Sequence, residues 1–199
     1  MNEAFVAELL DALPDRFGDT LADLPPDARV QAMATARQLA TLVRATRASY
    51  VLHVGGELGY TNLHIAGAFG HTGQLEIVVP DPKAACEIER LAERYALSER
   101  LSVHPGDAPA VVSGLNGPFD LIVLSGRWSD YPRLLDDLAR LNRVGGSLVV
   151  ANAAELPAAD AEAPDTVALR NVLTRLAADE RYVLSTGLDF STVLAARVR

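Results

Sequence analysis

A histidine, two glycines and a glutamate surround the end of one short apolar run. In VLHVGGELGY (51–60), His53 lies within the run, Gly55 and Gly59 follow it, and Glu57 separates them. A glycine-rich turn between a strand and a helix can hold a phosphate or an adenosyl group, because glycine lets the backbone approach a ligand closely. The spacing therefore predicts a nucleotide-type loop that carries unusual polar residues.

Polar residues also follow the next two apolar runs. Asp81 comes after LEIVV, and His104, Asp107 and Ala108 lie within HPGDA. Asp81 precedes Pro82 and so favours a turn that caps the next helix, although its carboxylate could also meet a ligand. Asp107 is likewise placed as a helix cap. His104 is our one candidate for a general base, on its closeness in sequence to Asp107.

A third group of side chains that could bind a ligand follows two later runs. Ser125, Arg127 and Trp128 come after FDLIVL, and Asn152 comes after SLVVA. An arginine next to the only tryptophan could form a stacked lid over a filled pocket. The same pair could instead line a pocket for a flat anionic ligand, and both alternatives stay open here.

The elements that position these residues alternate between short apolar runs and helical patterns. Strands are expected at 50–54, 75–79, 101–104, 119–124 and 147–151, and helices at 59–69, 83–96, 107–115 and 131–141. This alternation predicts parallel strands buried on both faces and right-handed crossovers.

The two ends of the chain depart from that rhythm. A helix at about 165–179 precedes two strand-like runs, 181–186 and 191–198, which predict an antiparallel pair at the sheet edge. Amphipathic helices are expected at 2–13 and 28–46. The fold class is therefore α/β, a Rossmann-like doubly wound sheet of about seven strands, in one domain over 1–199 with 1–48 as an N-terminal helical extension.

Composition excludes several classes of protein. The chain has 199 residues and a formal charge of −8, which disfavours nucleic acid or an anionic membrane as the main partner. It shows neither a basic signal sequence nor an apolar run of roughly 20 residues. Its one cysteine, Cys86, is expected to be a buried thiol. We expect a cytoplasmic protein that binds neither nucleic acid nor membrane.

Several stretches resemble, in order, motifs of the small-molecule O-methyltransferases that include the catechol and caffeoyl-CoA enzymes, a class I family dependent on S-adenosylmethionine. They are VLHVGGELGYTNLHIA (51–66), HPGDA (104–108), FDLIVL (119–124) with Tyr131, and RVGGSLVVAN (143–152). The similarity continues to the end of the chain and covers about 35–199. A dinucleotide dehydrogenase is disfavoured, because Glu57 and Tyr60 stand where its motif needs glycine.

The resemblance implies which residues would contact S-adenosylmethionine. His53, Gly55, Glu57 and Gly59 would lie beside its methionine part, Asp81 could reach the ribose, and Asp107 and Ala108 would meet the adenine. The chain departs from the family at three positions. The Glu57 carboxylate would face the carboxylate of the ligand at close range, where two like charges repel each other. His53 replaces an acid that holds the ammonium group, and Val79 replaces the acid that binds the ribose hydroxyls. We therefore expect cofactor binding that is weak or lost.

The resemblance also implies a divalent metal site, which this sequence lacks. Ser125 and Ala151 stand at the two metal-binding aspartates and Trp128 stands at the lysine that takes the proton, so only Asn152 remains. We expect a family member that acts on a small molecule without a metal. The alternative is a catalytically inactive relative that binds a small ligand or a protein partner. The broad apolar face of the 28–46 helix, together with the resemblance, predicts a homodimer.

Overall fold

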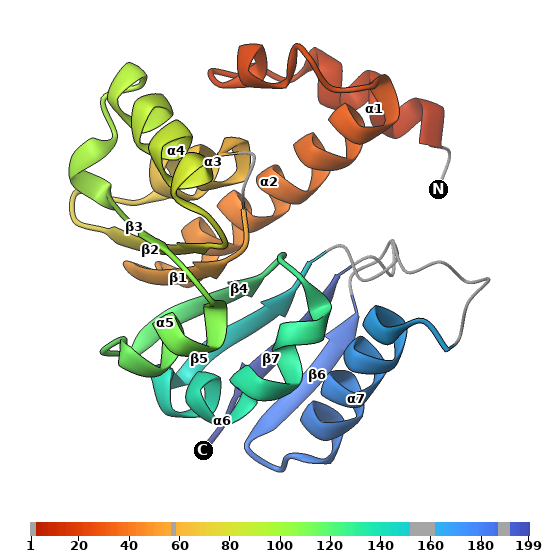
Figure 1. Ribbon diagram of the computed structural model, residues 1–199. Coiled ribbons are helices and arrows are strands. Elements are labelled where there is room, and N and C mark those ends of the chain that lie inside the picture. Colours follow the sequence, from red (N-terminus) through yellow and green to blue (C-terminus); the bar gives the residue numbers. More distant parts are fainter. Residues whose placement is uncertain (1–2, 57–58, 152–161, 187–191) are drawn as a thin grey trace.

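The structure is a computed structural model that describes residues 3–56, 59–151, 162–186 and 192–199 (Figure 1). Its strands form one sheet in the order β3-β2-β1-β4-β5-β7-β6. The strands are β1 (Tyr50–Val54), β2 (Gln74–Val79), β3 (Leu101–Pro105), β4 (Phe119–Leu124), β5 (Asn142–Val150), β6 (Tyr182–Thr186) and β7 (Val193–Arg197). The α-helices are α1 (Glu3–Ala12), α2 (Pro26–Thr46), α3 (Tyr60–Ala68), α4 (Pro82–Arg94), α5 (Ala108–Gly114), α6 (Tyr131–Leu141) and α7 (Pro164–Ala178).

The strand directions confirm the predicted doubly wound sheet. β1 is parallel to β2 and β4, and the β2–β3 and β4–β5 pairs are parallel too. β7 is antiparallel to both of its neighbours, β5 and β6. β6 is therefore the edge strand, and the reversed strand lies one place inside the edge.

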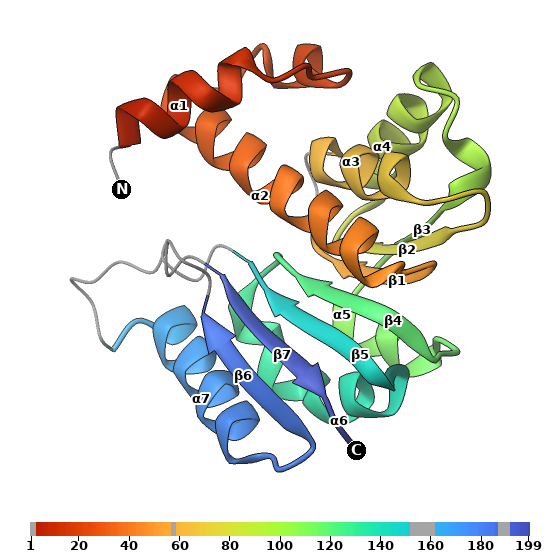
Figure 2. The same cartoon turned by 180° about the vertical axis from the view of Figure 1, so that it is seen from behind.

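Helices cover both faces of the sheet, as Figures 1 and 2 show from opposite sides. One core joins α2, α3 and α4 to side chains such as Val51 and Ile77, and the other joins α5, α6 and α7 to side chains such as Leu52 and Ile122. Successive residues of a strand point to opposite faces, so both sets of positions must be apolar. This explains why the strands appear in the sequence as continuous apolar runs.

Three details differ from the sequence-based expectations. β5 begins at Asn142, directly after α6, because Asn142 pairs with Phe119 across a register irregularity that the glycines of this segment accommodate. α2 begins at Pro26, a residue that favours the first turn of a helix. Cys86 is exposed rather than buried, because α4 turns Ala85 and Ile88 toward the sheet.

The apolar face of α2 is covered largely within the chain. Met33, Leu39 and Val43 are buried, and Val30 and Leu42 pack against the same core. This face therefore does not by itself require a second protomer, and the homodimer stays a prediction. Among the described helices, none is both long enough and apolar enough to cross a membrane.

Candidate functional site

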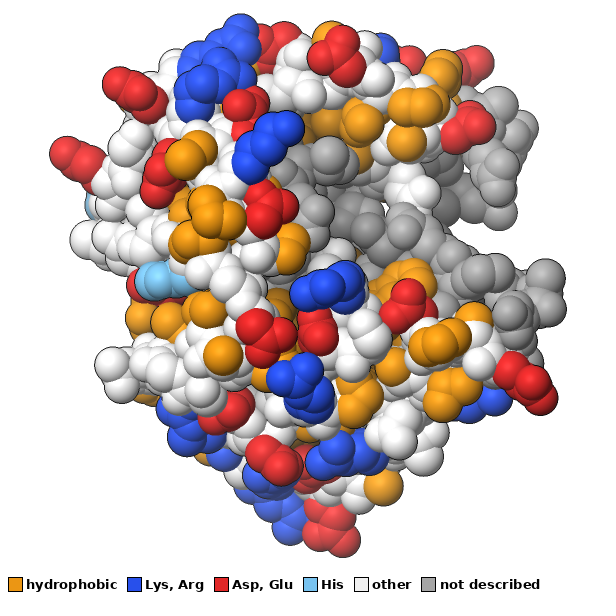
Figure 3. All heavy atoms as spheres, viewed as in Figure 1, with side chains coloured by type: hydrophobic (Ala, Val, Ile, Leu, Met, Phe, Trp, Pro, Cys, Tyr) orange, Lys and Arg blue, Asp and Glu red, His pale blue; other side chains and the backbone are white. Residues whose placement is uncertain are grey.

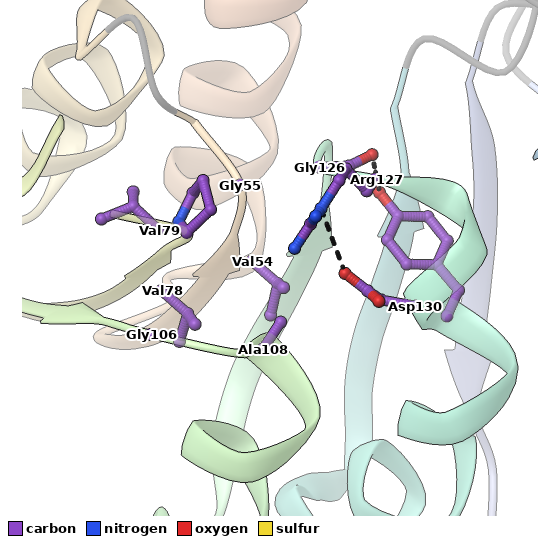
Figure 4. Close-up of a pocket in the computed structure, with 11 residues that line it drawn as sticks. Val54, Gly55, Val78, Val79, Gly106, Ala108, Gly126, Arg127 and Asp130 are labelled. Atoms are coloured by element: carbon purple, nitrogen blue, oxygen red, sulfur yellow. Dashed lines mark hydrogen bonds and ion pairs between the residues drawn. The ribbon is translucent and has the colours of Figure 1, made fainter. Parts of the chain in front are cut away.

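A small cavity marks the place where the carboxyl ends of β1, β2, β3 and β4 meet (Figure 4). Its walls are mainly apolar or glycine and include Val54, Val78, Val79 and Ala108, while Arg127 and Asp130 supply charge. In doubly wound sheets a ligand binds in the crevice at this end of the strands. The volume is about 20 Å³, which is enough for one or two water molecules.

A chain of hydrogen bonds, buried at His53 and Asn62 and partly buried at its ends, links the loop after β1 to the loop after β4. Asn62 on α3 donates from Nδ2 to the carbonyl of Gly56 at 2.8 Å, so its Oδ1 is left to accept. Oδ1 lies 2.6 Å from His53 Nδ1, and His53 Nε2 lies 2.6 Å from Ser125 Oγ. Because an amide oxygen can only accept, His53 carries its proton on Nδ1, and the Ser125 hydroxyl donates to Nε2.

The environment of His53 keeps its imidazole neutral. The side chain is fully buried, and burial lowers its pKa to about 4, although the bond to Asn62 acts in the opposite direction. Both ring nitrogens already have partners inside the protein. The prediction that His53 contacts a cofactor is therefore not supported by its position, because the ring joins two loops from within.

Two glycines allow close packing around this chain of hydrogen bonds, and one of them, Gly55, brings the two loops into direct contact. A Cβ atom on Gly55, which has a φ of +107°, would lie 2.4 Å from the amide nitrogen of Gly126. A Cβ on Gly56 would lie 2.4 Å from the His53 ring. Only glycine can satisfy both the positive φ and this closeness. Close packing in this region therefore accounts for both glycines.

The other residues predicted to contact the cofactor are divided between the crevice and helix starts. Ala108 lines the crevice, and Gly59 has a φ of +74° as the residue before α3. Asp81 caps α4 by accepting from the amides of Lys83 and Ala84 at 2.8 and 2.9 Å, so its capping role is confirmed. Asp107 precedes α5, but its side chain makes no capping hydrogen bond and pairs with Arg133 at 3.3 Å, so the expected cap is not formed. Glu57 lies outside the described residues.

An ion-pair chain runs along one side of the crevice. Arg127 Nε lies 3.4 Å from Asp130, Arg133 lies 3.9 Å from the same carboxylate, and Arg133 also reaches Asp107. In Figure 4 the Arg127 side chain extends toward Asp130. Trp128 packs partly buried against the core of the α5–α7 face. The stacked Arg–Trp lid is therefore not formed, because Arg127 pairs with an acid instead.

His104 lies away from the crevice. Its Nε2 is 2.6 Å from Glu76 Oε2 on β2, and Glu76 also lies 3.5 Å from the Tyr50 hydroxyl. His104 does not line the cavity, so the prediction that it acts as a base has no support from geometry.

The residues at the expected metal positions do not fit a divalent cation. The Ser125 hydroxyl already forms a hydrogen bond with His53, and the side chain of Ala151 is a fully buried methyl group that offers no ligand atom. Magnesium needs several oxygen ligands, usually including a carboxylate. Asn152 lies outside the described residues. Within the described ranges no group of three His, Cys, Asp or Glu side chains could hold a metal.

Sequence reasoning missed Asn62, the residue that orients His53. Its signal was an amide on a mainly apolar helix, nine positions after the histidine. It also missed Asp130, whose ion pair with Arg127 faces the crevice. Tyr131 was noted only as part of a motif; it is buried, it donates to the Gly126 carbonyl at 3.1 Å, and burial raises its pKa.

Comparison with known proteins identifies relatives of the whole fold. Among solved structures, the O-methyltransferase TomG from Streptomyces achromogenes, involved in tomaymycin synthesis and solved with S-adenosylmethionine, superposes with a TM-score of 0.81. The match is 18% identical and covers 98% of this chain and 96% of that chain. The Bacillus cereus O-methyltransferase with S-adenosylhomocysteine gives 0.79, at 20% identity over 99% and 96% of the two chains. These likenesses show the fold.

Sequence relatives match part of the chain. A catechol O-methyltransferase from Niastella koreensis is 28% identical over 118 residues, 57% of this chain and 53% of that protein, so the match spans about half the relative's length. Tricin synthase 1 from Oryza sativa subsp. japonica is 27% identical over 165 residues, 73% of this chain and 65% of the relative. The family model described as O-methyltransferase matches residues 19–189, and the chain therefore belongs to this class I S-adenosylmethionine-dependent O-methyltransferase family.

Proposed function

We propose that this protein is a catalytically inactive member of its family, in which the cofactor crevice is closed by the chain's own residues. The observation that carries the proposal is the buried chain from Asn62 through His53 to Ser125. It occupies the point where the resemblance places the acid for the ammonium group and the first metal aspartate. The protein then acts by binding rather than by methyl transfer.

Energetics support weak binding of S-adenosylmethionine. Val79 has no atom that can accept a hydrogen bond from a ribose, and neutral His53 has no free acceptor for an ammonium group. Each hydrogen bond to a charged group contributes about 1.5–3 kcal/mol. Losing two such contacts weakens binding by roughly a hundredfold or more. Opening the crevice would also separate the Gly55 and Gly126 backbones and break the buried chain.

Two measurements on the purified protein test this proposal. Isothermal calorimetry should show little or no heat with S-adenosylmethionine at concentrations up to a millimolar. Assays with catechol or caffeoyl-CoA should give no methylated product with or without magnesium. Low-micromolar cofactor affinity would contradict the closed crevice, and magnesium-stimulated methylation would contradict the loss of the metal site as well.

A second candidate is methyl transfer to a small molecule without a metal. Family membership favours it, as does the retained crevice wall of Val54, Gly106 and Ala108. Such a reaction would rely on holding the acceptor close to the methyl group. Transfer of labelled methyl groups in the presence of a chelator would select this candidate, with a ligand near Ser125, Arg127, Trp128 and Asn152.

The remaining proposals concern the protein as a whole. One domain with residues 1–48 as its helical extension, a cytoplasmic location and a homodimer are consistent with the acidic composition and the single cysteine. Nucleic acid and membranes are not proposed as partners. The homodimer is the most directly measurable of these, because light scattering gives the mass of the assembly.

A further inference from the structure

A second and larger depression lies on the helical layer formed by α2 and α3. It is an open groove of about 520 Å³ between these helices and the segment that follows α1. Three arginines, Arg16, Arg37 and Arg44, stand around it, and Phe17, Ala40 and Ala68 contribute apolar surface. This arginine groove shares no lining residue with the crevice described above.

The arginines are held in place by the backbone. Arg37 donates to the carbonyls of Leu13 and Pro14 at 3.2 and 3.1 Å, Arg44 donates to Gly67 at 3.4 Å, and Arg16 donates to Tyr95 at 2.7 Å. A guanidinium group has five N–H donors, so these bonds leave others for a ligand. Because the side chains are already oriented, binding an anion restricts them little further.

The nearest acid compensates this charge only in part. Asp15 lies 4.0 Å from Arg37 and 3.2 Å from His64 Nε2. Its carboxylate also accepts from the Tyr60 hydroxyl at 2.5 Å and from the Phe17 amide at 2.9 Å. Asp15 therefore offsets the charge of Arg37 only in part, because its carboxylate is shared with His64 and Tyr60. The groove is thus a cationic region in a chain with a formal charge of −8.

The spacing on α2 indicates the shape of the ligand. Arg37 and Arg44 are seven residues apart, which is two helical turns or about 10 Å. Ala40 and Thr41 lie between them on the same face, and Gly67 and Ala68 line the groove from α3. Small residues on both walls let another helix approach closely. A groove this open would leave a small molecule largely in solvent, whereas a helix could lie along its length.

We propose that the arginine groove binds an acidic amphipathic helix of a protein partner. Carboxylates two turns apart on that helix pair with Arg37 and Arg44, and the small apolar side chains between them pack on Phe17 and Ala40. This surface does not depend on whether the cofactor crevice is open. A contrary result in the cofactor experiments would therefore not contradict this proposal. A failure of peptide binding would likewise not contradict the proposed loss of cofactor binding.

The test uses a fluorescein-labelled, alanine-rich helical peptide with two glutamates seven residues apart and alanines between them. Fluorescence anisotropy with the 199-residue protein should show binding about tenfold or more tighter than for the same peptide with glutamines, and this binding should weaken as salt rises. Equal affinity for the two peptides, or no binding, would overturn the proposal.

Two variants locate the site. Arg44→Ala removes one exposed guanidinium, and Thr41→Trp fills the groove from an exposed position of α2. Each should weaken the glutamate peptide about tenfold or more while circular dichroism stays unchanged. The matched control is Arg90→Ala on α4, which removes an exposed arginine paired with Glu87 and should change nothing. Unaltered binding by the two groove variants would place the peptide elsewhere and overturn the assignment.

Two further outcomes would identify a different occupant. A protein mass that rises with concentration, and that Arg44→Ala abolishes, would assign the groove to a second copy of the chain. Arg44-dependent binding of inorganic phosphate without peptide binding would assign it to a small anion. Either result would overturn the proposal of an acidic helix from another protein.

Discussion

At the scale of single residues, Ser125 changes what the crevice can do. A carboxylate at this position could bind a cation, whereas the Ser125 hydroxyl donates its one proton to His53 Nε2. That bond requires a neutral imidazole, and the buried environment supplies one. His53 and Ser125 stand where the resemblance places a cofactor contact and a metal ligand. Here they bond to each other and so hold the loop after β1 against the loop after β4.

His53 should make stability depend on pH. Its folded pKa of about 4 lies below the ordinary histidine value of 6.5, so the unfolded chain takes up a proton first as the pH falls. Stability should therefore decline below pH 6.5 and level off below about pH 4. We expect urea unfolding at pH 4.5 and 7.5 to show a loss on the order of 2 kcal/mol more in the wild type than in His53→Gln. Equal losses in the two proteins would show that His53 is not held neutral by the fold.

Restoring the family's acids should improve cofactor binding. The triple variant His53→Glu, Glu57→Gly and Val79→Glu breaks the buried chain and supplies two carboxylates at the positions that the resemblance assigns to the ammonium group and the ribose. We expect affinity for S-adenosylmethionine, measured by calorimetry, to rise about tenfold or more. The control is the neutral triple variant His53→Gln, Glu57→Gly and Val79→Leu. A folded acidic variant that binds no better than this control would mean that the pocket is misplaced.

At the scale of helices and strands, the sequence predicts the elements better than the contacts between them. The apolar runs at 50–54 and 119–124 coincide with β1 and β4, because buried parallel strands need apolar side chains on both faces. The contact between His53 and Ser125 depends on the pairing of those strands, which are about seventy residues apart in the chain. No short stretch of sequence specifies how two distant strands pair. The position of the site could therefore be predicted from the sequence, whereas its hydrogen bonds could not be predicted.

The start of β5 shows the same limit. Arg143 and its neighbouring glycines have weak strand propensity, and the strand was expected only from 147. In the structure Arg143 donates to Asp120, the carboxylate that also receives the amides of Ser49 and Tyr50 at 2.7 and 2.9 Å. Asp120, which belongs to β4, therefore links the first residues of β1 and the first residues of β5 to β4 through hydrogen bonds.

Replacing Asp120 should weaken this junction. Asn cannot accept the same set of N–H donors and carries no charge toward Arg143, so Asp120→Asn should lower the free energy of unfolding by about 2–3 kcal/mol in urea at pH 7. The matched control is Asp136→Asn, whose side chain is 97% exposed and which should change stability by less than about 0.5 kcal/mol. Equal stability of both variants would contradict the role assigned to Asp120.

The same carboxylate contributes to acid stability in a defined range. Burial raises its pKa, but hydrogen bonds from Ser49, Tyr50 and Arg143 outweigh burial, so the pKa lies below the ordinary aspartate value of 3.8. Its contribution is present above that value and is lost as the pH falls through the lower folded pKa. This range lies below that of His53, so the two groups can be distinguished in one titration.

At the scale of the whole molecule, charge is distributed rather than gathered on the face seen in Figure 3. Acidic and basic side chains alternate over that face, and a hollow separates the N-terminal helices from the C-terminal half of the sheet. A surface of mixed sign gives no extended attraction for a polyanion. The mixed surface charge is consistent with the expectation that nucleic acid is not the partner. Local features such as the arginine groove would then determine which partner binds.

The strongest indication of self-association now lies on the N-terminal helix. Phe5, Leu9 and Leu13 are 60%, 49% and 40% exposed and follow one another at intervals of four residues, so they form one stripe along and just beyond α1. Such a stripe favours burial against another surface. Leu42, by contrast, packs partly buried against the chain's own core, so a charge there would unfold the protein rather than divide a dimer.

We therefore expect light scattering at micromolar concentration to give about twice the chain mass of 21.2 kDa. In a twofold dimer each substitution acts on both copies of the stripe, so Leu9→Glu should yield a folded monomer. The matched control Leu173→Glu changes a leucine of α7 that packs against the opposite core, and it should lower stability without producing a folded monomer. A wild-type mass of one chain would end the prediction of a dimer, and a Leu9→Glu variant that stays dimeric would move the interface away from α1.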